Sequence, residues 1–114
     1  MAKSSVPDPL QRRHELERNL EPDRCVAVAE AYLAEGRTVE AVAFLVKGDA
    51  AERLRALRQQ AVEEGDAFLL RTVNEALDET SDAATWARLA DAAANAGKER
   101  YAEEARRLAE RLGA

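Results

Sequence analysis

Three glycines divide the chain at nearly regular intervals. Gly36, Gly65 and Gly97 are 29 and then 32 residues apart, and each follows a segment whose apolar residues recur at helical spacing. Glycine is preferred just past the end of a helix, because it adopts a left-handed backbone without a steric penalty. Periods of about 20 to 50 residues are typical of stacked supersecondary units. The spacing therefore predicts a chain built from similar helical hairpins.

Equivalent positions around the three glycines carry similar side chains. Apolar residues stand eleven, eight and four positions before each glycine and five positions after it: Cys25, Leu54 and Trp86; Val28, Leu57 and Leu89; Tyr32, Ala61 and Ala93; Ala41, Leu70 and Ala102. We expect the small residues Ala29, Ala41, Ala90 and Ala102 to let helix axes approach closely. The larger Tyr32, Trp86 and Tyr101 are expected to fill wider gaps.

The composition favours helices throughout. The chain has 114 residues, 25 of them alanine, and Ala, Leu, Glu and Arg together make up more than half of it. We predict an all-α protein with a mobile tail over residues 1–8, a helix over 9–20, and one domain over 9–114. Its hairpins are expected at about 23–48, 49–77 and 82–113. Asp49 with Glu52 predicts a capping box, and Asp66 and the polar run 78–82 predict further helix caps.

Charge and hydropathy exclude several classes of protein. The formal net charge is -5, which argues against binding to nucleic-acid phosphates as the main activity. The longest apolar run, over 41–46, is far too short to span a membrane, and we expect no signal peptide. The single cysteine, Cys25, is expected to be a buried, inert thiol in a reducing cytoplasm. Arginine outnumbers lysine 14 to 3, which is typical of a GC-rich genome and favours a bacterial source.

No arrangement of residues indicates catalysis. His14 lies beside Glu15 and Glu17, but no Ser or Cys nucleophile stands at a recognisable spacing from it. One His and one Cys are too few for a structural zinc site, and no glycine-rich phosphate loop is present. We therefore expect a protein that is not an enzyme and has no metal or cofactor.

The third hairpin carries a family pattern. Its residues Trp86-x-x-Leu89-Ala90-x-x-Ala93-x-x-x-Gly97-x-x-x-x-Ala102 resemble the tetratricopeptide repeat (TPR), and so do Ala29, Tyr32, Gly36 and Ala41 of the first hairpin. The middle hairpin departs from it, with Arg58 and Leu70 at positions that the family keeps small. The boundary proline is missing, and the units are shorter than about 34 residues. The resemblance covers residues 23–112 and implies a short right-handed solenoid; the alternative is an ordinary helical bundle whose glycines only end helices.

The resemblance implies an adaptor that binds a helix or extended peptide of another protein. The groove would be lined by the first helix of each hairpin, at the following positions: Asp23, Val26, Glu30 and Leu33; Glu52, Arg55, Gln59 and Val62; Ala87, Asp91, Ala94 and Asn95. Arg55 is the expected anchor, because arginine is enriched at binding hot spots. The mixed acidic and apolar character of this set makes an acidic C-terminal peptide a poor ligand.

Two other interactions stay open. Tyr101, Leu108 and Leu112 on the last helix have no following repeat to cover them, so the chain is alternatively a structural module that dimerises through its terminal helices. An N-terminal arm with Lys3, Arg12 and Arg13 is a weaker candidate for contact with nucleic acid or an acidic protein. The helix expected over 9–20 either caps the solenoid or occupies its groove.

Overall fold

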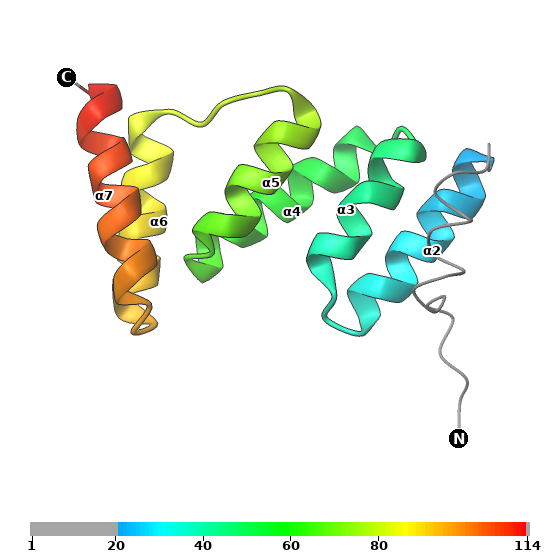
Figure 1. Ribbon diagram of the computed structural model, residues 1–114, viewed down its shortest axis with the longest axis horizontal. Coiled ribbons are helices and arrows are strands. Elements are labelled where there is room, and N and C mark those ends of the chain that lie inside the picture. Colours follow the sequence, from blue (N-terminus) through cyan, green and yellow to red (C-terminus); the bar gives the residue numbers. More distant parts are fainter. Residues whose placement is uncertain (1–20, 114) are drawn as a thin grey trace. The chain divides into compact units, whose positions relative to one another are not determined.

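A computed structural model describes residues 21–113, which form six α-helices and no strand (Figure 1). The helices are α2 (Pro22–Ala34), α3 (Thr38–Lys47), α4 (Ala51–Glu64), α5 (Ala67–Leu77), α6 (Ala83–Asn95) and α7 (Glu99–Gly113). The all-α prediction is confirmed for this part of the chain. The predicted tail over 1–8 and helix over 9–20 lie outside the described residues. No helix within 21–113 is long and apolar enough to cross a membrane.

The chain divides into two compact units between Leu54 and Arg55, inside α4. In the first unit, α2 and α3 pack side by side (Figure 1). Their buried residues are Cys25, Val28, Ala29 and Tyr32 from α2 and Ala41, Val42, Phe44 and Leu45 from α3. The rings of Tyr32 and Phe44 stack with centroids 5.6 Å apart, and the Arg37 guanidinium lies 4.9 Å from the Tyr32 ring centroid. This aromatic pair forms the centre of the first core.

The end of α3 corrects one sequence prediction. Gly48 has an ordinary helical φ of -82°, but a Cβ there would lie 2.9 Å from Val26 Cγ2 and 3.1 Å from the Pro22 carbonyl oxygen. Glycine is therefore needed at this position for close packing of the end of α3 against α2. The left-handed residue is Asp49, with φ 52°, and α4 begins two residues later at Ala51. The predicted capping box at Asp49 is wrong, because this residue ends α3 instead of capping α4.

The second unit has a larger core. Its buried residues come from all four helices of the unit: Leu57, Ala61 and Val62; Ala67, Leu69, Leu70 and Val73; Trp86, Leu89, Ala90 and Ala93; Ala102 and Ala105. Helices α6 and α7 pack along each other (Figure 1), and α5 also contacts α7. An ion pair between Arg71 and Glu104 joins α5 to α7. The predicted small residues Ala90 and Ala102 are buried here, whereas Tyr101 is half-buried.

The turn between α4 and α5 is held tightly against α6. Gly65 has a left-handed φ of 70°, and a Cβ there would lie 2.9 Å from the carbonyl carbon of Ala92 and still closer to the backbone of Ala93. Asp66 then caps α5 by accepting a hydrogen bond of 3.0 Å from the Leu69 amide, as the sequence predicts. The Lys98 ammonium donates to the Glu64 carbonyl oxygen over 2.9 Å, which satisfies one carbonyl at the end of α4. The turn therefore has little freedom to move away from α6.

Candidate functional site

An open cleft of about 560 Å³ lies in the second unit. Its walls are Arg58, Gln59 and Val62 from α4, residues 79–82 of the loop between α5 and α6, and Thr85 and Arg88 from α6. Most of these side chains are polar, and the volume falls within the range of ligand sites in proteins. The cleft is large enough to hold a few side chains of an extended peptide.

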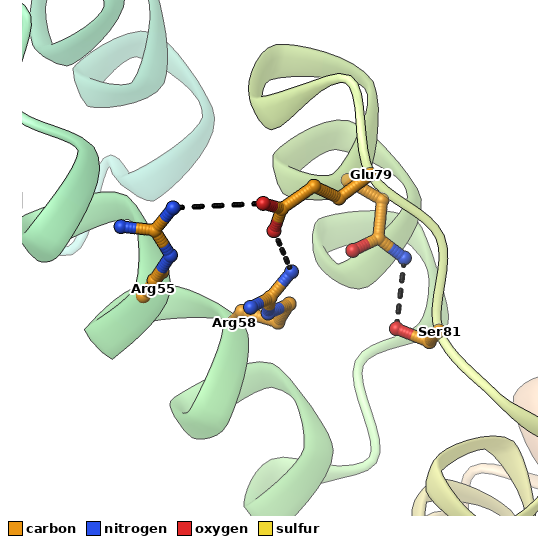
Figure 2. Close-up of polar contacts among 5 residues, drawn as sticks. Arg55, Arg58, Glu79 and Ser81 are labelled. Atoms are coloured by element: carbon orange, nitrogen blue, oxygen red, sulfur yellow. Dashed lines mark hydrogen bonds and ion pairs between the residues drawn. The ribbon is translucent and has the colours of Figure 1, made fainter.

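Two arginines of α4 share one carboxylate at the edge of this cleft (Figure 2). The Arg58 guanidinium donates to Glu79 Oε1 over 2.7 Å, and Arg55 donates to Glu79 Oε2 over 3.5 Å. The two arginines stand three positions apart, so they lie on one face of α4 and reach the same residue. The hydrogen bond from Arg58 is the main cause that lowers the pKa of Glu79 below its usual value, and the charge of Arg55 adds to it. Glu79 therefore stays ionised at neutral pH.

Short local contacts fix the loop that carries Glu79. Asp78 ends α5 in a left-handed conformation with φ 53°, and the Glu79 amide donates to the Asn74 carbonyl oxygen over 2.9 Å. The Asn74 side-chain amide donates to Ser81 Oγ over 3.0 Å (Figure 2). Asn74 is buried, and this bond satisfies its amide nitrogen, which would otherwise lose its water partners on burial. The loop thus leaves α5 in a defined direction and presents Glu79 to α4.

The far end of the loop caps α6. Asp82 Oδ1 accepts hydrogen bonds from the Thr85 amide over 2.8 Å and from Thr85 Oγ1 over 2.7 Å. The bond from the Thr85 hydroxyl is the largest cause that lowers the pKa of Asp82, followed by the bond from the Thr85 amide. The sequence predicted caps in this polar run, and Asp82 confirms that prediction. Its carboxylate is therefore engaged in holding the helix start.

Arg88 is the one cation of the cleft that forms no ion pair with any residue in 21–113. It is exposed on α6, and its charge acts on Asp82 without direct contact. Arg58 and Arg88 thus line the same cleft from two different helices. Of the two acidic residues in the lining, Glu79 already binds arginines and Asp82 already caps a helix.

The structure brings three predicted groove residues to this region. Gln59 and Val62 line the cleft, and Arg55 is joined to it through Glu79. Val62, however, is only 6% exposed, so most of its side chain contacts the protein core rather than the cleft. Gln59 is exposed and donates to Glu63 Oε1 over 3.2 Å. Gln59 is therefore the predicted residue best placed to touch a ligand.

The other predicted positions lie elsewhere. On α6, Ala87, Asp91 and Asn95 are exposed and Ala94 is half-buried, but none of them lines the cleft. In the first unit, Val26 and Leu33 are half-buried, and Asp23 and Glu52 are exposed. Glu30 accepts two hydrogen bonds from Arg53, of 2.8 and 3.2 Å, which raise the pKa of Arg53. The carboxylate of Glu30 is thus occupied within its own unit. Of the predicted dimer edge, Tyr101 and Leu108 are half-buried and Leu112 is exposed.

Several cleft residues were not predicted as site residues. They are Arg58, Arg88, Thr85 and the loop residues 79–82. One sequence feature pointed to the loop: the run 78–82 is the longest polar break after residue 20. It supplies Glu79, the carboxylate that Arg58 binds.

The chemistry available at the cleft is ionic and hydrogen-bonding. Within residues 21–113, no group of three His, Cys, Asp or Glu side chains is arranged to hold a metal ion. The cleft offers guanidinium, amide and hydroxyl donors from α4, the loop and α6. Such donors bind anionic or polar groups through directional hydrogen bonds. No protein-family model, characterised protein or solved structure significantly matches the chain.

Proposed function

We propose that the chain is a non-enzymatic interaction module that binds an extended segment of another protein, and that the cleft of the second unit is part of its binding surface. The observation that carries this proposal is the convergence of Arg58, Gln59, Thr80 and Arg88 on one open cleft. Side chains from two helices and a loop meet there and offer guanidinium, amide and hydroxyl groups. A polar cleft of this kind suits a peptide whose backbone and side chains supply complementary groups.

The similar local geometry of three glycine turns supports the same function. Gly36, Gly65 and Gly97 all have φ values between 70° and 76° and follow the first helix of each pair. The small residues Ala29, Ala41, Ala90 and Ala102 are all buried, as a TPR-like solenoid requires. We therefore also propose that the three helix pairs stack as TPR-like units. The buried free thiol of Cys25 supports a reducing compartment such as the cytoplasm.

Two neighbouring glutamines provide a test of the cleft. Gln59 donates to Glu63 over 3.2 Å and Gln60 donates to Glu64 over 3.3 Å, and both are exposed on α4, but only Gln59 lines the cleft. Gln59→Trp should fill the cleft, whereas Gln60→Trp places the same side chain outside it. Both variants lose an equivalent hydrogen bond, so their stabilities should be similar.

The experiment captures proteins from a lysate of the source organism on immobilised wild type and both variants. A candidate partner is then purified, and its affinity for each form is measured by calorimetry. We expect binding to wild type and Gln60→Trp, with a loss of at least about tenfold for Gln59→Trp. Equal affinity of a purified partner for the two variants would refute a role for the cleft.

Self-association is a second candidate function, and one observation favours it. Leu112 is 54% exposed near the end of α7, four residues after the half-buried Leu108, so the two lie on one face of the helix. A second copy could cover this apolar face. Light scattering of wild type and Leu112→Lys at rising concentration tests it: a dimer that Leu112→Lys dissociates is expected. A wild-type protein that stays monomeric at high concentration would rule this function out.

A further inference from the structure

The cleft of the second unit offers a ligand more hydrogen-bond donors than acceptors. Its two carboxylates are already engaged. Glu79 accepts a hydrogen bond of 2.7 Å from Arg58. Asp82 accepts from both the amide and the hydroxyl of Thr85. Arg88 lines the same cleft and forms no ion pair within the described part of the chain. The complementary ligand is therefore one that supplies acceptors and negative charge.

Arg58 keeps donors for a second anion while it holds Glu79. A guanidinium has five N–H groups. Within residues 21–113, Arg58 donates to Glu79 through Nη1 (Figure 2), which leaves the hydrogens of Nε and Nη2 for a ligand. The Arg58 side chain is 26% exposed and lines the cleft, so a ligand there can reach it. The ion pair with Glu79 therefore stays intact when an anion binds.

The loop between α5 and α6 adds neutral donors. Thr80 is exposed and Ser81 is half-buried, and both line the cleft. Ser81 Oγ accepts a hydrogen bond of 3.0 Å from the Asn74 side-chain amide, which holds this oxygen in place and leaves the hydroxyl hydrogen to donate. Donors from α4, from the loop and from α6 thus line one cleft.

Donors from three segments suit a phosphate group better than a carboxylate. A phosphate monoester presents three terminal oxygens and carries a charge of about -1.5 to -2 at pH 7. A carboxylate presents two oxygens and a single charge. Guanidinium groups bind phosphate oxygens through paired N–H donors, and these bonds are stronger than those between neutral groups.

We propose that the cleft holds a phosphate monoester, carried by a phosphorylated serine or threonine of the bound segment. This inference rests on the proposed function and adds the chemistry of the ligand. Arg88 and the remaining donors of Arg58 bind the phosphate oxygens, and the hydroxyls of Thr80 and Ser81 complete the set. Glu79 remains bound to Arg58 throughout.

The probe is an acetylated and amidated peptide in which glycines flank one phosphoserine. Two matched probes carry serine or glutamate in place of the phosphoserine. Binding is measured by nuclear magnetic resonance from the Nε–H signals of Arg58 and Arg88, at pH 7 and low ionic strength, because salt screens exposed charges. We expect the phosphoserine probe to bind at least about threefold more tightly than the glutamate probe, and the serine probe to leave the signals unchanged.

Arg88 provides the main variant. Arg88→Gln should weaken binding of the phosphoserine probe about three- to tenfold, because a charge and a forked donor are lost. Arg88→Lys should restore part of the affinity, because the charge returns without the fork. Arg107→Gln is the matched control: Arg107 is exposed on α7, outside the cleft, and also forms no ion pair with another described residue. It should leave the affinity unchanged.

A further arm identifies the source of the phosphate. The purified partner from the capture experiment is measured before and after treatment with a phosphatase. We expect its affinity for the wild-type chain to fall at least about threefold once the phosphate is removed.

Three results would overturn the proposal. One is equal binding of the phosphoserine and glutamate probes, and another is an equal loss in Arg88→Gln and Arg107→Gln. The third is a partner whose affinity does not change on treatment with phosphatase. These failures are separable from a failure of the proposed function, because Gln59→Trp fills the cleft without changing its charge. A partner lost in Gln59→Trp but bound equally by Arg88→Gln would leave the interaction module standing and remove the phosphate subsite.

Discussion

Gly65 packs against the backbone of Ala93, so close that the turn between α4 and α5 has no room for a Cβ. Gly36 and Gly97 adopt almost the same left-handed conformation, yet a Cβ at either position would meet no atom within 4 Å. Three glycines that look equivalent in the sequence therefore differ in what they contribute. All three permit a left-handed turn, and Gly65 alone also permits the contact between a turn and a helix.

This difference predicts unequal costs for the same substitution. Gly97→Ala should lower the free energy of unfolding by about 1 kcal/mol, because only the left-handed backbone is penalised. Gly65→Ala should lower it by about 1 to 3 kcal/mol more, because Ala93 must also move. Urea denaturation of both variants measures the two values. Equal losses would show that the turn is free to shift away from α6.

The cap at Asp82 predicts a pH-dependent contribution to stability. Because its pKa is lowered in the folded protein from 3.8, the ionised carboxylate stabilises the fold at pH values above 3.8. That contribution is lost as the pH falls through the lower, folded-state pKa. Asp82→Asn should therefore melt at a lower temperature than wild type at pH 7. The two melting temperatures should converge below pH 3.8; a difference that stays constant between pH 7 and pH 3 would contradict this.

Replacement by aspartate should destabilise the protein much more at Val62 than at Val39. Val62 is 6% exposed and Val39 is 44% exposed. Val62→Asp should lower the free energy of unfolding by more than about 3 kcal/mol, because it buries an unpaired carboxylate. Val39→Asp, in the first turn of α3, should change it by less than about 0.5 kcal/mol. Circular dichroism during thermal melting distinguishes them, and a stable Val62→Asp would mean that this position is open to solvent.

Cys25 and Trp86 allow the unfolding of the two units to be followed separately, because each residue is buried in a different unit. Cys25 is fully buried in the first unit, and Trp86, the only tryptophan of the chain, is 5% exposed in the second. We expect the thiol to react with Ellman's reagent only after denaturation, because burial excludes the reagent. Trp86 emission should shift to longer wavelength as its own unit unfolds. Rapid reaction of Cys25 under native conditions would show that the packing between α2 and α3 opens readily.

Local sequence patterns predicted the helices well. Apolar periodicity and the glycines place the three helix pairs within a few residues of their observed bounds, because both signals depend on neighbouring residues only. Asp66 and Asp82 were predictable as caps for the same reason. Asp49 was not, because the choice between ending α3 and starting α4 depends on how tightly Gly48 packs against α2.

The cleft could not be derived in the same way. Arg58 and Glu79 are 21 positions apart, and their contact depends on the path of the loop after Asp78. The family resemblance assigned both Val62 and Gln59 to one groove. It gave no measure of burial, and burial distinguishes the core residue Val62 from the exposed residue Gln59. The same pattern left out Arg88, because it took no account of the loop residues 79–82 that line the cleft together with Arg88.

The division between the two compact units falls inside α4, between Leu54 and Arg55, and not in a loop. A helix forms and melts cooperatively, and its backbone hydrogen bonds run from each residue to the fourth before it. Unfolding that starts at the first turn of α4, at Ala51, would therefore spread toward the turns on which Arg55 and Arg58 stand. The hold of these arginines on Glu79 thus depends on a helix that stays formed from its start.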